Sequence, residues 1–180
     1  MRAIAGTRFS IISLNELGCF DEIPETGMTL SENAFQKAQY IHEKFNCNCF
    51  ADDTGLEIEA LNGRPGVYSA RYAGEHCSAK DNIEKVLHEL KNISNRKAYF
   101  KTVIALILNN ENYFFEGKVE GEIIESCRGS CGFGYDPIFI PSGHHITFAE
   151  MTENEKNSIS HRAIATQKLN DFLQSCNISK

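Results

Sequence analysis

Residues 98–124 read AYFKTVIALIL-NNEN-YFFEGKVEGEII, and this stretch decides the fold. Its first eleven residues are rich in β-branched and aromatic side chains, which favour strands. Residues 109–112 have the composition of a turn, and strand-forming residues return after them. The pattern predicts a long hairpin, in which Ala98 to Leu108 pairs with Tyr113 to Ile124 and forms the spine of a sheet.

Three other segments carry helical patterns. Thr29 and Glu32 have the spacing of a capping box, and apolar residues then recur every three or four positions. Ser78 can cap a second helix, and residues 160–176 predict a last one. The residues expected to face inward are Ala34, Ala38, Ile41 and Phe45 in the first helix, Ile83, Val86, Leu87 and Leu90 in the second, and Ala165, Leu169, Phe172, Leu173 and Cys176 in the last.

Short strands are expected at Phe9 to Leu14, at Cys49 to Asp52 and at Leu56 to Ile58, the last two on either side of a turn. Because helices and strands mix without strict alternation, we expect the α/β (α+β) class, with a long mixed sheet flanked by helices. The 180 residues favour a single domain over residues 1–180.

Charge and cysteine content narrow the possible functions. The formal net charge of −6 argues against a general nucleic-acid binder, which would show a basic face. We expect no membrane span and no secretory signal, and therefore a cytoplasmic protein. The seven cysteines follow no regular framework, which is typical of reduced thiols. Zinc binding by Cys47 and Cys49, or by Cys127 and Cys131, would require an unusual spacing.

Two adjacent carboxylates, Asp52 and Asp53, stand before Thr54 and Gly55. On an extended backbone they point to opposite sides, so that one can face a cleft while the other braces the chain. Carboxylate oxygens are the ligands that Mg²⁺ prefers, and this ion bridges to substrate phosphates. An Asx turn that only caps a loop is the alternative interpretation, and both stay open.

Glu32 lies in the first turn of the first predicted helix. Its place in the capping box accounts for it, and an exposed capping carboxylate can also bind a metal ion. Spacing does not decide between the two.

Glycines recur before Phe133, Tyr135 and Asp136, in the segment 129–137. Glycine allows close backbone approach, and the two aromatic rings offer flat faces for stacking a base. Asp136 can accept hydrogen bonds from the N–H groups of such a base. The competing interpretation is a β-turn closed by Pro137 and packed by its own aromatic residues.

Lys156, His161 and Arg162 lie just before or at the start of the last predicted helix. A helix N-terminus attracts anions, and arginine presents a planar fork of donors suited to phosphate or to a base carbonyl. The alternative is a solvated basic turn in which Ser160 caps the helix.

In this order, the motifs resemble the Ham1-type inosine triphosphate pyrophosphatase family, and the resemblance extends from about residue 9 to residue 173. The matching stretches are LSENA at 30–34 with the lysine and alanine at 37–38, ADDTGLE at 51–57, GRPGVYSARYAG at 63–74, GFGYDPIF at 132–139, FAEM at 148–151 and EKNSISHRA at 155–163.

The resemblance implies a Mg²⁺-dependent enzyme that cleaves ITP, dITP and XTP between the α- and β-phosphates and releases pyrophosphate. It also implies two lobes around a central active-site cleft, and a homodimer. Asp53 matches the general base and a metal ligand, and Glu32 matches a second metal ligand. The positions that match substrate-binding residues are Thr54, Phe133, Gly134, Tyr135, Asp136, Lys156, His161 and Arg162.

One part of the family pattern has no match. The family usually opens with a strand, a Ser/Thr-x-Asn-x-x-Lys loop and a helix, whereas residues 1–6 of this chain align with the end of that helix. The sequence therefore predicts an N-terminally shortened domain without that phosphate-binding lysine. Two alternatives stay open: a longer native protein that is active, or a shortened, catalytically impaired nucleotide-binding paralogue.

Overall fold

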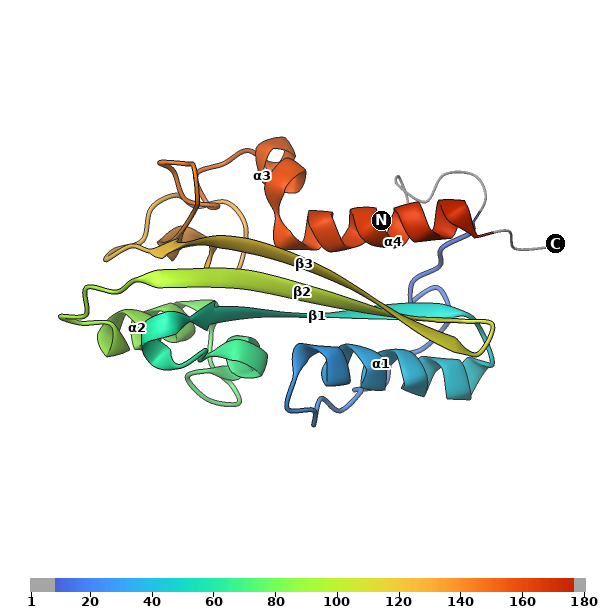
Figure 1. Cartoon of the computed structure of the whole chain (residues 1–180). Helices are drawn as coiled ribbons and strands as arrows, with labels where there is room; N and C mark the ends of the chain where they lie inside the picture. The colour runs from blue at the N-terminus through green and yellow to red at the C-terminus, as the bar shows by residue number, and fades with distance from the viewer. Residues whose placement is uncertain (1–8, 177–180) are drawn as a thin grey trace.

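Residues 9–176 are described by a computed structural model, in which helices cover both faces of a four-stranded sheet (Figure 1). The strand order is β1 (Cys49–Ile58), β2 (Lys97–Leu108), β3 (Glu111–Ile123) and β4 (Phe139–Pro141). The predicted α/β class is confirmed. The described strands all pair antiparallel, so this part of the sheet is not mixed. The N-terminal departure from the family pattern, at residues 1–6, lies outside the described residues.

The β2–β3 hairpin is confirmed as the longest pairing of the sheet. Its register runs from Lys97↔Glu122 to Leu108↔Glu111, so the turn is the two residues Asn109 and Asn110. Both have positive φ, 52° and 66°, and this left-handed backbone matches the twist of the strands. The turn is shorter than expected because residues 111 and 112 already pair with β2.

Two long helices cover opposite faces of the sheet, α1 (Leu30–Phe45) below and α4 (His161–Ser175) above in Figure 1. The capping box of Thr29 and Glu32 opens α1 as predicted. Alanines of α1 pack on β2 residues 105 and 107, and apolar residues of α4 pack on β2 residues 104, 106 and 108. β2 is therefore buried from both sides along its second half.

The remaining helices are short and lie at the other end of the sheet. They are η1 (Glu59–Leu61), η2 (Gly66–Arg71), α2 (Ala79–Glu89), η3 (Asp136–Ile138) and α3 (Glu153–Ile159). Ser78 caps α2 as predicted, whereas α3 was not predicted, although Thr152 and Glu155 form a capping box for it. No helix within residues 9–176 has the length and apolar character that a bilayer crossing requires.

The core has two parts, which agrees with the expectation of two lobes. One part gathers residues of α2, β4, the last residues of β1 and the first residues of β2, among them Leu56, Val86, Phe100 and Phe139. The other lies under α1 and α4, around β2 residues 104–108. Residues 102 and 103 of β2, and residues 53 and 54 opposite them, lie between the two parts.

Two predictions about strands were wrong. Residues 9–14 form no strand: Ile12 is 57% exposed and Leu14 is 41% exposed, so neither has a buried face to pack on. The two pieces predicted within residues 49–58 are one continuous strand, and Asp53 pairs with Val103 in the ladder. This pairing excludes the Asx turn. Gly55 permits close packing here rather than a turn, because a Cβ on it would lie 2.5 Å from the carbonyl oxygen of Gly66.

Candidate active site

Strand β1 sends two successive carboxylates to opposite faces of the sheet. Asp52 pairs with Arg162 of α4, and Asp53 pairs with Lys37 of α1. Because α1 and α4 cover opposite faces, the two carboxylates pair with different helices from one strand. The divergence expected from an extended backbone is thus observed.

On the α4 side, β1 holds one edge of the Arg162 guanidinium. Nε and Nη2 donate to Asp52 Oδ2 at 3.2 and 3.1 Å, and Nη2 also donates to Thr54 Oγ1 at 3.2 Å. The hydrogen bonds of this side chain within the described residues all come from Nε and Nη2. The Nη1 edge therefore remains available to an acceptor on a ligand.

The glycine-rich loop places an exposed ring beside two cations. The Phe133 side chain is 61% exposed. Its ring centre lies 4.6 Å from Lys156 Nζ and 5.5 Å from Arg162 Cζ, distances at which cations and rings attract. A flat apolar face flanked by donors can stack a nucleobase and bind its carbonyl oxygens.

The Asp136 carboxylate holds the glycine-rich loop in place. The residue is 2% exposed, and its carboxylate accepts a hydrogen bond from the Phe133 N–H at 2.8 Å and pairs with the Lys156 ammonium group. Gly132 has φ of 79°, and a Cβ there would lie 2.1 Å from Asp136 Oδ2. Gly134 also has a positive φ, 58°, so both glycines are required by the backbone.

Tyr135 does not offer its ring for stacking. The side chain is 4% exposed, belongs to the core, and donates from its hydroxyl to the Ser69 carbonyl oxygen at 2.9 Å. Burial also raises the pKa of the hydroxyl. Of the two aromatic residues proposed to stack a base, the structure leaves only Phe133 at the surface.

His161 is buried, although the sequence suggested that it joins Lys156 and Arg162 in an anion site. It is 3% exposed and stacks on Phe100, with ring centres 4.7 Å apart. Burial, followed by the charges of Arg162 and Lys156, lowers its pKa to about 3. Its Nδ1 is buried without a hydrogen-bond partner in the described part of the chain. The positive charge beside Phe133 therefore comes from Lys156 and Arg162.

On the α1 side, Asp53 is held by two side chains of one helix face. Lys37 Nζ donates to its Oδ1 at 3.2 Å, and Asn33 Nδ2 donates to its Oδ2 at 3.3 Å. Lys37 is shared with Glu25, whose Oε1 lies 2.6 Å away. Burial raises the pKa of Asp53, against the lowering effect of Lys37 and Asn33. A carboxylate with a raised pKa is a better general base than an ordinary one.

Glu32 caps α1 and stays exposed. Its Oε2 accepts from the N–H groups of Met28 at 2.6 Å and Thr29 at 3.1 Å. The next residue, Asn33, donates to Asp53, so Glu32 is one residue away from the side chain of α1 that contacts Asp53. Within residues 9–176, no three His, Cys, Asp or Glu side chains converge on one point. Two carboxylates suit Mg²⁺, which takes its remaining ligands from water and phosphate.

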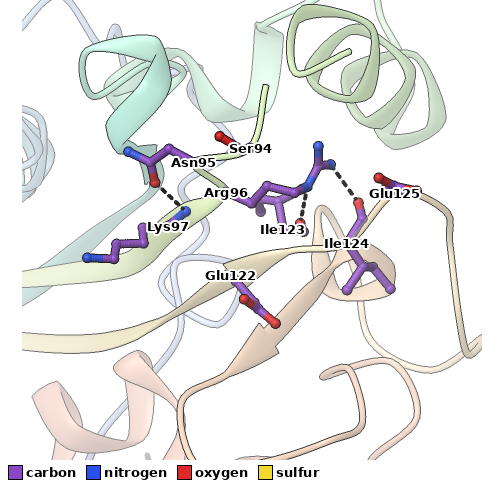
Figure 2. Close-up of a pocket in the computed structure, with 8 residues that line it drawn as sticks. All are labelled: Ser94, Asn95, Arg96, Lys97, Glu122, Ile123, Ile124 and Glu125. Atoms are coloured by element: carbon purple, nitrogen blue, oxygen red, sulfur yellow. Dashed lines mark hydrogen bonds between the residues drawn. The ribbon is translucent and has the colours of Figure 1, made fainter. Parts of the chain in front are cut away.

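A separate hollow of about 710 Å³ lies away from these residues (Figure 2). It is formed where β2 begins and β3 ends, by residues 94–97 and 122–125. Arg96 crosses it and donates to the carbonyl oxygens of Leu90, Ile123 and Ile124. These bonds use the guanidinium to join α2 to the sheet, so the hollow carries none of the chemistry described above.

Comparison with known proteins shows which family the chain belongs to. A family model described as the Ham1 family matches residues 1–172. The chain belongs to the Ham1 family. Its resemblance to that family, inferred above from motifs, is thereby confirmed.

Named relatives and solved structures in the Ham1 family cover nearly the whole chain. A dITP/XTP pyrophosphatase of Porphyromonas gingivalis is 55% identical over 174 residues, which are 96% of this chain and 90% of the relative. One of Bacillus subtilis is 51% identical over 169 residues, 92% of this chain and 85% of the relative. The structure of the Staphylococcus aureus Ham1 protein superposes with a TM-score of 0.91 at 41% identity, covering 96% of this chain and 91% of that one.

Three residues that contact the candidate site were not singled out from the sequence. Asn33 and Lys37 are four residues apart on α1 and meet Asp53 together, a spacing that places them on one helix face. Their signal was present, but the partner strand could not be known. Thr102 has no local signal, because only the register of β2 against β1 brings it to Thr54.

Proposed function

We propose that the chain hydrolyses dITP, XTP and ITP to the nucleoside monophosphate and pyrophosphate, and so removes these nucleotides from the cellular pool. The observation that carries the proposal is the opposite orientation of neighbouring side chains on β1. Asp53 contacts α1, while Asp52 and Thr54 hold Arg162 beside the exposed Phe133 ring. The relatives named dITP/XTP pyrophosphatase supply the substrate class.

The purine would stack on Phe133, with Lys156 and Arg162 donating to its oxygens. Hypoxanthine, the base of ITP and dITP, and xanthine carry a 6-keto oxygen where adenine carries an amino group. A site built from donors leaves them unpaired when adenine binds, and an unpaired buried donor costs about 1–3 kcal/mol. This cost supports discrimination against ATP and dATP without any steric block.

Asp53 would act as general base by accepting a proton from the water that attacks the α-phosphorus. Lys37 and Asn33 hold both carboxylate oxygens in place, which fixes the direction of the base. The bond from the α-phosphorus to the bridging oxygen breaks, and pyrophosphate leaves. Glu32 and Asp53 would hold Mg²⁺, which when bound neutralises charge on the phosphates.

We further propose a cytoplasmic homodimer. The free cysteines within the described residues are consistent with a reducing compartment. Light scattering on the purified chain distinguishes a dimer of twice 20.2 kDa from a monomer.

The decisive experiment separates the products formed by the full chain with Mg²⁺ from dITP, XTP and dATP. The proposal requires monophosphate and pyrophosphate from the first two and little from dATP. Asp53→Asn should abolish release, whereas Glu22→Gln, which removes an exposed carboxylate from the preceding loop, should not. Inorganic phosphate as product, equal turnover of dATP, or an inactive wild-type chain would refute the proposal, and the last result would favour the impaired paralogue.

A further inference from the structure

Thr102 is a fully buried hydroxyl at the centre of the sheet. It lies in β2 directly opposite Thr54 of β1 and opposite Gly117 of β3. A Cβ on Gly117 would lie 2.0 Å from the carbonyl oxygen of His161, so the first turn of α4 packs directly over this position. The start of α4 therefore excludes water from Thr102.

The buried hydroxyl has one hydrogen-bond partner within the described residues. Thr102 Oγ1 lies 2.6 Å from Thr54 Oγ1, and either oxygen can be the donor by distance alone. Thr54 is only partly buried and also accepts from Arg162 Nη2 at 3.2 Å. Only one of the two hydroxyl protons lies in the Thr54–Thr102 hydrogen bond. The direction of this bond therefore depends on whether the other hydroxyl proton finds an acceptor.

If Thr54 donated to Thr102, the proton of Thr102 would be buried with no acceptor. Leaving a buried donor unpaired costs about 1–3 kcal/mol. If Thr102 donates instead, the two lone pairs of Thr54 are filled by Thr102 and Arg162, and the buried Thr102 donor is satisfied. The proton left over then belongs to Thr54, the more accessible of the two.

We propose that Thr102 is a positioning residue that fixes the Thr54 hydroxyl as a hydrogen-bond donor toward an oxygen atom of the nucleotide. With both lone pairs filled, Thr54 presents no acceptor, so this position and the free edge of Arg162 both select for oxygen. The inference rests on the proposed function for the identity of the ligand. The polarity of the bond stands on the structure alone.

A purely structural role is the competing account. Threonine pairs across neighbouring strands contribute about 0.2–1 kcal/mol to sheets. A structural Thr102 would affect unfolding and leave substrate binding unchanged. The two accounts therefore predict different Michaelis constants for a variant that lacks the Thr102 hydroxyl.

The test compares Thr102→Val, which keeps the shape and removes the donor, with Thr102→Ser, which keeps the donor. With dITP, Thr102→Val should raise KM about threefold to tenfold, the range of one net hydrogen bond, with kcat little changed. Thr102→Ser should restore the wild-type KM. A wild-type KM in Thr102→Val, together with a lowered melting temperature, would overturn the proposal.

A second measurement does not depend on activity. In NMR spectra of the wild-type chain, the Thr102 hydroxyl proton should be protected from exchange with water, while that of Thr54 exchanges rapidly. The reverse pattern would overturn the assignment of donor and acceptor. If the chain releases no pyrophosphate from dITP, the proposed function fails, and the NMR result still decides the polarity of this bond.

Discussion

The buried ion pair beneath the Phe133 loop gives the sharpest stability prediction. The Asp136 side chain is 3% exposed and that of Lys156 is 15% exposed. The Lys156 ammonium group also lies 4.6 and 5.5 Å from the ring centres of Phe133 and Phe148. Asp136→Asn keeps an oxygen for the Phe133 N–H but removes the charge that balances Lys156. The variant therefore isolates the cost of an unpaired buried cation.

The expected magnitude follows from that cost. Breaking a buried pair by removing one partner destabilises a protein by about 3–5 kcal/mol. For a domain of this size, each kcal/mol lowers the melting temperature by about 2–4 °C, so the variant should melt at least 6 °C below the wild type. Asp136→Asn combined with Lys156→Met should recover part of the loss, because no unpaired charge remains.

The free energy of unfolding can be measured by urea titration with far-ultraviolet circular dichroism. Glu120→Gln is the matched control, because its partner Lys118 and Glu120 itself are 40% and 71% exposed. Its transition should coincide with that of the wild type, since exposed pairs contribute little. An Asp136→Asn transition that also coincides with the wild type would refute the reasoning.

Three further variants test other parts of the structure. The pKa of His161, about 3 in the folded chain against 6.5 for an ordinary histidine, means that the unfolded chain binds more protons between these values. The free energy of unfolding of the wild type should therefore fall by about 2 kcal/mol between pH 7 and pH 5. In urea titrations, that of His161→Phe should fall less over the same range. Gly117→Ala should destabilise by at least about 1–3 kcal/mol and raise KM for dITP, because a Cβ would collide with the start of α4; wild-type stability would contradict the packing. Thr29→Ala should cost about 1 kcal/mol through loss of the α1 cap, whereas Thr29→Ser should not.

The sequence predicted those parts of the fold that local chemistry determines. The hairpin of β2 and β3, the caps at Thr29 and Ser78, and the last helix all follow from patterns within a few residues. β1 was divided wrongly because Gly55 is typical of a turn. Its actual reason is the approach of Gly66, which only the tertiary structure reveals.

The sequence likewise predicted the candidate site only where local geometry determines it. The motifs identified the family, and the opposite directions of Asp52 and Asp53 followed from strand geometry. The burial of Tyr135 and the lowered pKa of His161 depend on what packs around them, so the sequence alone suggested a stacking ring and an anion-binding side chain. The assignment of Glu32 and Asp53 to a metal ion remains a prediction.

The central claim is that β1 separates binding from chemistry, and one pair of variants tests it directly. Steady-state kinetics with dITP should be measured for Asp52→Asn and Asp53→Asn. We expect Asp53→Asn to lower kcat by at least about a hundredfold while the affinity for dIMP is kept, because a general base contributes that much. Asp52→Asn should mainly raise KM, because Arg162 loses its anchor. Similar losses of kcat in both variants, or a loss confined to Asp52→Asn, would contradict the account.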